Sequence, residues 1–181
     1  RAVSDASKKG GKDAASASDG AAPRKTCNRA CLVQFIDQYL DGLVKNDSSK
    51  IKVASRLRFT ENGKEIRLGE GIWTTTTALR SFREDFVDAV QGQAGSFVVF
   101  EESGAPALLT LRLKVVDNQI TEIETIVSRT GAHMFFAPDN LVEADPLFEE
   151  IVPDAQRSSR SDLEKSANAY FDVLESGDGS A

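Results

Sequence analysis

Two long runs of alternating apolar and polar residues limit most strongly how this chain can fold. They span 107–116 and 119–128, and Asp117-Asn118 lies between them. Alternation with a period of two places the apolar side chains on one face of a strand, and Asp and Asn favour tight turns. The pattern predicts a hairpin of two half-buried strands at the centre of an antiparallel sheet.

A helical stripe precedes these strands. Apolar residues recur over 31–44 at the spacing of one face of a helix. Thr26 or Asn28 can cap the start of this helix, and Asn46-Asp47-Ser48-Ser49 can end it. We expect the helix to cover the apolar face of the sheet.

Shorter signals complete the first unit. Asn62-Gly63 between the runs 56–59 and 64–68 predicts a hairpin, because both turn positions require a positive φ. A short helical turn is expected at 49–54 and a further strand at 96–102. The segment 74–86 fits either a helix or a strand.

Composition divides the chain into four segments. Residues 1–25 are rich in Ala, Ser, Gly and Lys and are expected to be disordered. Residues 26–131 form the domain, and 132–159 form an irregular, Pro-containing linker. Residues 160–181 form a last helix that opens with the capping box Ser161-Asp162-Leu163-Glu164.

The last helix resembles the first. Shifting the sequence by 131 positions aligns seven identical residues in 21, including Tyr39 with Tyr170 and Leu43 with Leu174. The match suggests a duplicated unit. The chain is then either a piece of a two-domain protein, or the last helix docks on the first unit or on a partner. A coincidence of helical patterning is the remaining alternative.

Charge and hydropathy exclude some partners. Residues 1–26 carry a net +3, which leaves −9 on the rest of a chain whose formal charge is −6. An acidic domain repels phosphate backbones, so we expect no nucleic acid. The basic tail is a candidate for an electrostatic tether. No apolar run is long enough for a membrane helix, so no membrane insertion is expected.

The two cysteines, Cys27 and Cys31, are four positions apart. Cys27 capping the helix start and Cys31 packing in the core is one interpretation. A local disulfide is the other, and it favours an exported or periplasmic protein over a cytoplasmic one. Asn46-Asp47-Ser48 is also an N-glycosylation sequon.

The element order and several strings resemble the SnoaL-like domains of the nuclear transport factor two superfamily, close to bacterial and fungal proteins that often carry tandem units. The resemblance implies an α+β fold in which a strongly bent antiparallel sheet wraps around the N-terminal helix as a cone. The strings are Tyr39-Leu40-Asp41, Phe59-Thr60-Glu61-Asn62-Gly63, Leu68-Gly69-Glu70-Gly71-Ile72-Trp73, Gly92-Gln93-Ala94-Gly95, Leu111-Arg112-Leu113-Lys114-Val115 and Ile120-Thr121-Glu122-Ile123-Glu124.

Enzymes on this fold need a pocket with a base and a hydrogen-bond donor. Tyr39 is the candidate donor, with a core role as its alternative. Asp85 and His133, the single histidine, are the candidate bases. A structural or solvated role is the alternative for both.

Four further residues are candidates for ligand binding. Trp73 and Phe86 would be apolar walls, although Trp73 equally fits the core. Arg58 and Arg112 would contact a hydroxylated or anionic ligand, and cross-strand ion pairs are the alternative explanation for them.

Signatures of phosphate-binding loops, nucleophile elbows and metal sites are absent from the sequence. We therefore expect no metal and no cofactor. The favoured function is a small-molecule pocket with acid–base chemistry of an isomerase, dehydratase or lyase on an apolar, partly hydroxylated compound. The alternative is a non-catalytic ligand-binding or oligomerisation module, acting as a homodimer or with a second tandem domain.

Overall fold

The computed structural model of the 181-residue chain describes residues 27–131 and 137–177. The elements run, in chain order, α1 (Arg29–Lys45), β1 (Val53–Glu61), β2 (Lys64–Glu65), η1 (Gly71–Thr74), β3 (Thr76–Asp88), β4 (Gln93–Glu102), β5 (Ala105–Val116), β6 (Gln119–Arg129), η2 (Pro138–Asn140), η3 (Pro146–Glu149), η4 (Asp154–Gln156) and α2 (Arg160–Ser176).

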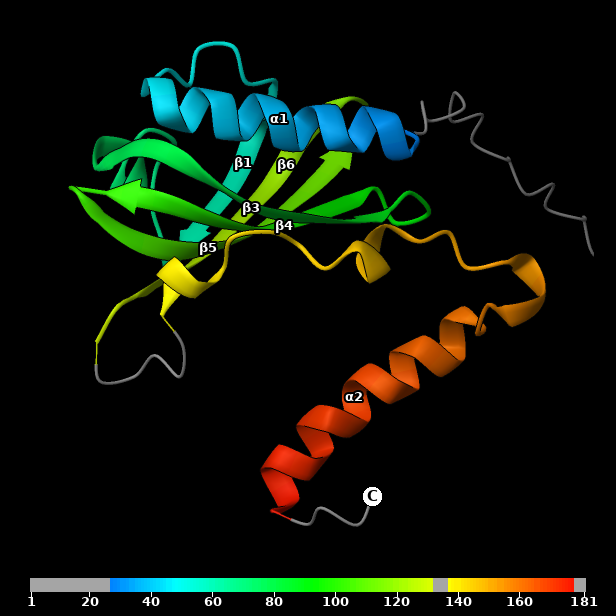
Figure 1. Cartoon of the computed structure of the whole chain (residues 1–181). Coiled ribbons are helices and arrows are strands. Elements are labelled where there is room, and N and C mark those ends of the chain that lie inside the picture. The colour runs from blue at the N-terminus through cyan, green and yellow to red at the C-terminus, as the bar shows by residue number, and fades with distance from the viewer. Residues whose placement is uncertain (1–26, 132–136, 178–181) are drawn as a thin grey trace, which may run out of the picture.

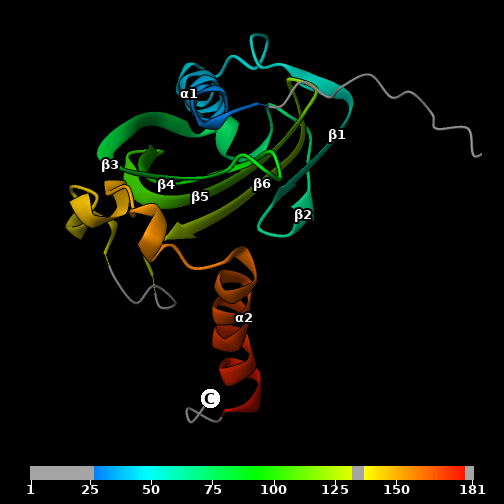
Figure 2. The ribbon, with the colours of Figure 1, turned by 90° about the vertical axis from the view of Figure 1, so that its right-hand side faces the viewer.

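The six strands form one sheet in the order β2-β1-β6-β5-β4-β3. Helix α1 lies across one face of the sheet (Figure 1), and the sheet curves around it when the helix is viewed end-on (Figure 2). The predicted α+β cone is confirmed. All neighbouring strands are antiparallel except β1, which runs parallel to β6, so the sheet is not purely antiparallel.

Capping residues set the length of α1. The side chain of Asn28 accepts a hydrogen bond from the backbone N–H of Cys31 at 3.0 Å, which satisfies one free donor of the first turn. Asn46 ends the helix in the left-handed conformation at φ 49°. Close packing also fixes the helix, since a Cβ added at Gly42 would lie 2.9 Å from the carbonyl oxygen of Asp47 and 3.3 Å from the Trp73 ring.

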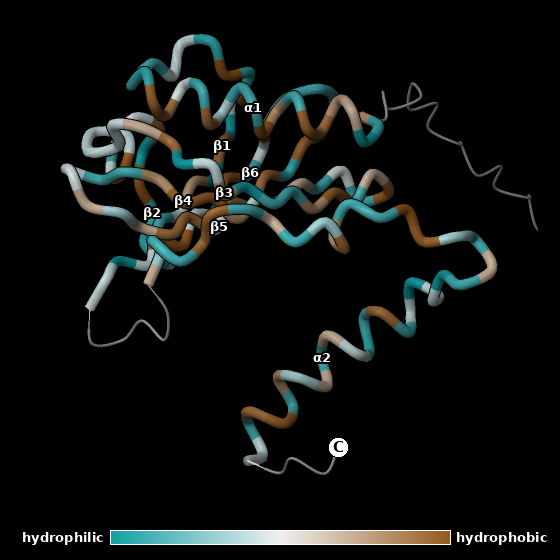
Figure 3. The backbone as a smooth tube through the Cα atoms, viewed as in Figure 1, coloured by the Kyte–Doolittle hydropathy of each residue, from teal (hydrophilic) through white to brown (hydrophobic). Residues whose placement is uncertain are grey.

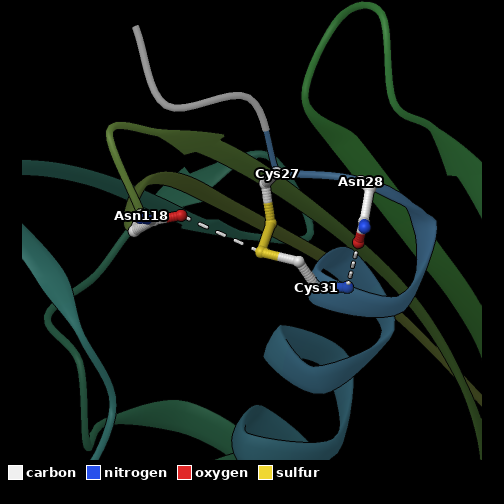
Figure 4. The surroundings of a disulfide bond; sticks show 4 residues. All are labelled: Cys27, Asn28, Cys31 and Asn118. Carbon is white, nitrogen blue, oxygen red and sulfur yellow. Dashed lines mark hydrogen bonds between the residues drawn. A yellow bond between two sulfur atoms is a disulfide. The ribbon is translucent and has the colours of Figure 1, made fainter.

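A disulfide joins Cys27 to Cys31 at the start of α1 (Figure 4). The interpretation of Cys27 and Cys31 as unpaired cap and core residues was therefore wrong. Cys27 precedes the N-cap and is not helical, so its Cα lies 5.3 Å from that of Cys31, within the usual disulfide range. Cys31 Sγ lies 3.9 Å from Asn118 Oδ1 in the β5–β6 turn, a packing contact because a disulfide sulfur has no proton to donate.

The core lies between α1 and the concave face of the sheet. Every second side chain of β5 from Ala107 to Val115 is buried, as the alternation predicted. Apolar residues accordingly concentrate in the strands beneath the helix (Figure 3). The largest fully buried side chains are Trp73, Tyr39, Phe59, Phe100, Leu32, Ile36, Leu40, Leu43, Ile72, Leu109, Leu111 and Leu113.

Two loops and the segment 74–86 can be compared with their predictions. Asn62 and Gly63 have φ values of 48° and 76°, which confirms the predicted hairpin turn. The expected helical turn at 49–54 was wrong, because residues 48–51 form a turn closed by the Ile51 N–H and the Ser48 carbonyl, and β1 begins at Val53. The open segment 74–86 is largely strand β3.

Helix α2 projects away from the sheet (Figures 1 and 2), and none of its residues is buried. Its N-cap is Ser159, whose side chain accepts from the Asp162 N–H, so the capping box begins two residues earlier than predicted. No helix among the described residues is long and apolar enough to cross a membrane.

The two helices have the same length and matching caps. Each spans 17 residues, from N-caps at Asn28 and Ser159 to left-handed C-caps at Asn46 and Gly177. All of these positions differ by 131, the shift that aligns the sequences.

Candidate functional site

Tyr39 and Trp73 form a pair at the centre of the core. Both are 0% exposed. The indole Nε1–H donates to the Tyr39 hydroxyl at 3.2 Å, and the rings meet edge to face with centroids 5.3 Å apart. The structure thus places the candidate donor and the candidate wall together, but inside the packed core that was the alternative for each.

Asp85 is held by hydrogen bonds on the inner side of β3. The Arg83 guanidinium donates to both of its oxygens, at 3.0 and 2.7 Å, and Ser96 Oγ donates to Oδ1 at 2.7 Å. Arg83 also reaches Asp37 on α1 at 2.7 Å, and its hydrogen bond to Asp85, with that to Asp37, raises the pKa of the guanidinium. These contacts tie the edge strand to the helix and fix the Asp85 carboxylate in one orientation.

A hollow of about 430 Å³ opens beside this cluster, between α1 and the edge strand β3; we call it the β3 hollow. Helix, strand and linker each contribute to its wall. The lining residues are Arg29, Val33, Arg83, Glu84, Asp85, Ala144, Phe148 and Glu149.

Glu84 is the residue that the sequence analysis missed. It is half-buried and lines the β3 hollow, and its Oε1 is buried without a hydrogen-bond partner among the described residues. A buried carboxylate oxygen without a donor is costly. The signal was its position next to Asp85, but the segment fitted helix or strand equally, so the direction of its side chain could not be inferred.

The outer wall of the β3 hollow is part of the linker, residues 137–149, which we call the strap. Arg80 pairs with Asp139, and Ser81 Oγ donates to the Val142 carbonyl at 2.7 Å. Arg80 and Ser81 lie in an irregular stretch of β3, where the register shifts between Leu79 and Arg83. The irregularity therefore coincides with the attachment of the strap.

An aromatic contact attaches the strap at its far end. Phe148 lies edge to face with Phe86, with ring centroids 6.5 Å apart, and Phe86 meets Phe97 in the same way at 5.1 Å. Phe86 therefore supports the wall of the β3 hollow from outside rather than lining it.

Phe86 and Arg112 meet at a second hollow of about 300 Å³ near the end of the β3–β4 hairpin, which Gln93 and Gly95 also line. Arg112 pairs with Glu122 at 2.7 Å and with Glu124 at 2.9 Å. The cross-strand ion pairs, the alternative explanation for Arg112, are therefore present.

The remaining candidates lie elsewhere. Arg58 is exposed on β1, and strands β6, β5 and β4 separate it from Asp85 on β3. His133 lies outside the described residues. Among the described residues, the structure thus distributes the candidates over the core, the β3 hollow, the hairpin hollow and β1, and brings no more than two of them together at any one place.

A helix lying across the concave face of a bent six-stranded sheet is the α+β cone that the sequence predicted. Residues 25–127 match the family model described as "Domain of unknown function (DUF8021)", and the chain belongs to that family. No curated protein matches the sequence.

Solved structures that are similar to the chain include the following three. AclR, a putative hydroxylase from Streptomyces galilaeus, has 14% identity and a TM-score of 0.45, over 78% of this chain and 97% of that one. A putative ketosteroid isomerase from Kribbella flavida has 14% identity and a TM-score of 0.41, over 71% and 95%. An NTF2-like protein of unknown function from Shewanella baltica has 16% identity and a TM-score of 0.37, over 56% and 92%.

The buried Tyr39 hydroxyl predicts a distinctive loss of stability at high pH. Burial raises its pKa above the ordinary value of about 10. The unfolded chain then releases this proton at lower pH than the folded protein. The contribution of Tyr39 to the free energy of unfolding is therefore complete below about pH 10 and is lost as the pH rises above it.

Urea unfolding at pH 9 and pH 11 measures this loss. Wild type and Tyr170→Phe, a control on exposed α2, should lose more stability between the two pH values than Tyr39→Phe. At neutral pH, Tyr39→Phe should also cost about 1–3 kcal/mol, because the Trp73 N–H is left without its acceptor. An equally steep loss in Tyr39→Phe would contradict the burial of this hydroxyl.

Proposed function

We propose that the protein binds a small, partly hydroxylated organic compound in the β3 hollow. The observation that carries this proposal is Glu84, whose Oε1 is buried without a donor among the described residues that line or surround the hollow. A hydroxyl or amine of a ligand would supply that donor. A volume of about 430 Å³ is within the usual range for small-molecule sites.

The chemistry of the wall supports such a ligand. Val33, Ala144 and Phe148 offer apolar surface, while Arg83, Glu84 and Asp85 provide fixed polar groups at one side. Asp85 already accepts three hydrogen bonds, so its orientation is set before any ligand arrives. A preorganised polar group of this kind gives specificity at low entropic cost.

Acid–base catalysis by an isomerase, dehydratase or lyase mechanism without a cofactor is the finer part of the proposal. Glu84 would be the proton acceptor, because its Oε1 has no competing donor among the described residues. Asp85 and Arg83 would orient the substrate. Tyr39 would act only through packing, since its hydroxyl is fully buried against Trp73.

The binding proposal predicts the effects of two substitutions. A set of hydroxylated ring compounds would be screened against ¹⁵N-labelled protein, and the compounds that shift amide signals would be titrated. Glu84→Gln should weaken binding about tenfold or more, because the hydrogen bond to a charged group is lost. Asp85→Asn should also weaken binding.

Glu122→Gln is the matched control, because Glu122 is a partly exposed glutamate of the same sheet paired with Arg112 and does not line the β3 hollow. It should leave binding unchanged. Signal shifts that cluster around Arg112 and survive Glu84→Gln would contradict the proposal.

The apolar face of α2 favours a second candidate function, assembly. Leu163, Tyr170, Phe171 and Leu174 are each more than half exposed. Their counterparts at Leu32, Tyr39, Leu40 and Leu43 are buried against the sheet. We propose that α2 is the first helix of a second unit of the same type. In a chain of residues 1–181, the exposed apolar face of α2 would pack against a second copy of the chain.

Light scattering after size exclusion tests this second candidate. Wild type should form a dimer at high micromolar concentration, and Leu163→Asp with Leu174→Asp should return it to a monomer. Val90→Asp, at an exposed apolar residue in the β3–β4 turn, should leave the dimer intact. A wild-type monomer at that concentration would contradict the assembly proposal and leave the binding proposal untouched.

A further inference from the structure

The backbone conformation at position 46 does not by itself explain why this residue is an asparagine. It ends α1 in the left-handed conformation, and its N–H donates to the Gly42 and Leu43 carbonyls. Glycine serves best at such a position. At the matching end of α2 the residue is Gly177, at φ 67°. Glycine and asparagine both occur in this conformation, so the backbone does not by itself require asparagine at position 46.

The side chain of Asn46 is available for reaction. The residue is exposed, and its amide makes no hydrogen bond to any described residue. The chain continues as Asp47-Ser48, and this is the single Asn-x-Ser/Thr triplet in the sequence. The matching triplet after α2, Gly177-Asp178-Gly179, keeps the aspartate and lacks both the asparagine and the serine.

The disulfide supplies the second, independent observation. Cys27 and Cys31 are joined, and such bonds persist in oxidising compartments such as the endoplasmic reticulum and the cell exterior. The secretory route of eukaryotic cells both forms disulfides and attaches glycans to Asn-x-Ser/Thr. The two features therefore fit one cellular route.

We propose that Asn46 is an N-glycosylation site. In the transfer, Asn46 Nδ2 forms a bond to the anomeric carbon of an oligosaccharide carried on a polyprenyl pyrophosphate. The bond from that carbon to the pyrophosphate oxygen breaks, the polyprenyl pyrophosphate leaves, and a base of the transferase takes one Nδ2 proton. No oxidant or reductant is involved.

The surroundings of Asn46 accommodate a sugar. A hollow of about 250 Å³ lies beside it, lined by Gln38, Asp41, Gly42, Lys45, Asp47 and Lys50. Asn46 is also 13 residues along the chain from Val33 of the β3 hollow, or about 20 Å at the helical rise. The attachment point is therefore well separated from the β3 hollow along α1.

Peptide mass spectrometry of the protein from its native source tests the proposal. The peptide that contains Asn46 should carry a hexosamine-based glycan, and peptide N-glycosidase should convert Asn46 to Asp as it releases the glycan. A fully unmodified Asn46 in protein whose Cys27–Cys31 disulfide is formed would overturn the proposal.

Secretion of the full chain from a eukaryotic host provides a matched set of variants. Asn46→Gly, which keeps the left-handed C-cap, and Ser48→Ala should each abolish the glycan. Ser49→Ala, one residue beyond the triplet, should retain it. A glycan that persists in Asn46→Gly would also overturn the proposal, because the chain has no second triplet of this kind.

Discussion

The contact between the apolar stripe of α1 and the concave face of the sheet supports the rest of the structure. Leu32, Ile36 and Leu43 are fully buried there, and burying one such side chain contributes about 1.5–3 kcal/mol. The hydrogen bond from Trp73 to Tyr39 gives the buried indole N–H an acceptor inside this packing. The bent sheet thus closes on the helix around a core of buried apolar side chains.

Because side chains fill the core, the candidate ligand site lies at the edge of the sheet. β3 is an edge strand, and a long exposed edge invites aggregation unless something covers it. Arg83 joins this strand to Asp37 of α1, and the strap follows its outer side from Arg80 to Phe86. The β3 hollow is the space left between these three elements, so the same contacts protect the edge and shape the candidate site.

The sequence predicted the features that depend on local patterning. The helix, the Asn62-Gly63 turn and the central hairpin follow from periodicity and turn chemistry, and all three are present. β3 escaped prediction because the register shift after Leu79 interrupts its alternation. Asp85 was recognised as a candidate from its residue type alone. Glu84 was missed because its importance depends on the strap, which lies some 60 residues away in the sequence.

A crystal structure of the chain soaked with hydroxylated ring compounds tests the central claim most directly, because it shows where a ligand lies. The account predicts density in the β3 hollow, with a ligand hydroxyl or amine within hydrogen-bond distance of Glu84 Oε1, and an unchanged contact between Tyr39 and Trp73. Density for the compound between α1 and the sheet, with Tyr39 and Trp73 separated to admit it, would contradict the filled core and the proposed site together.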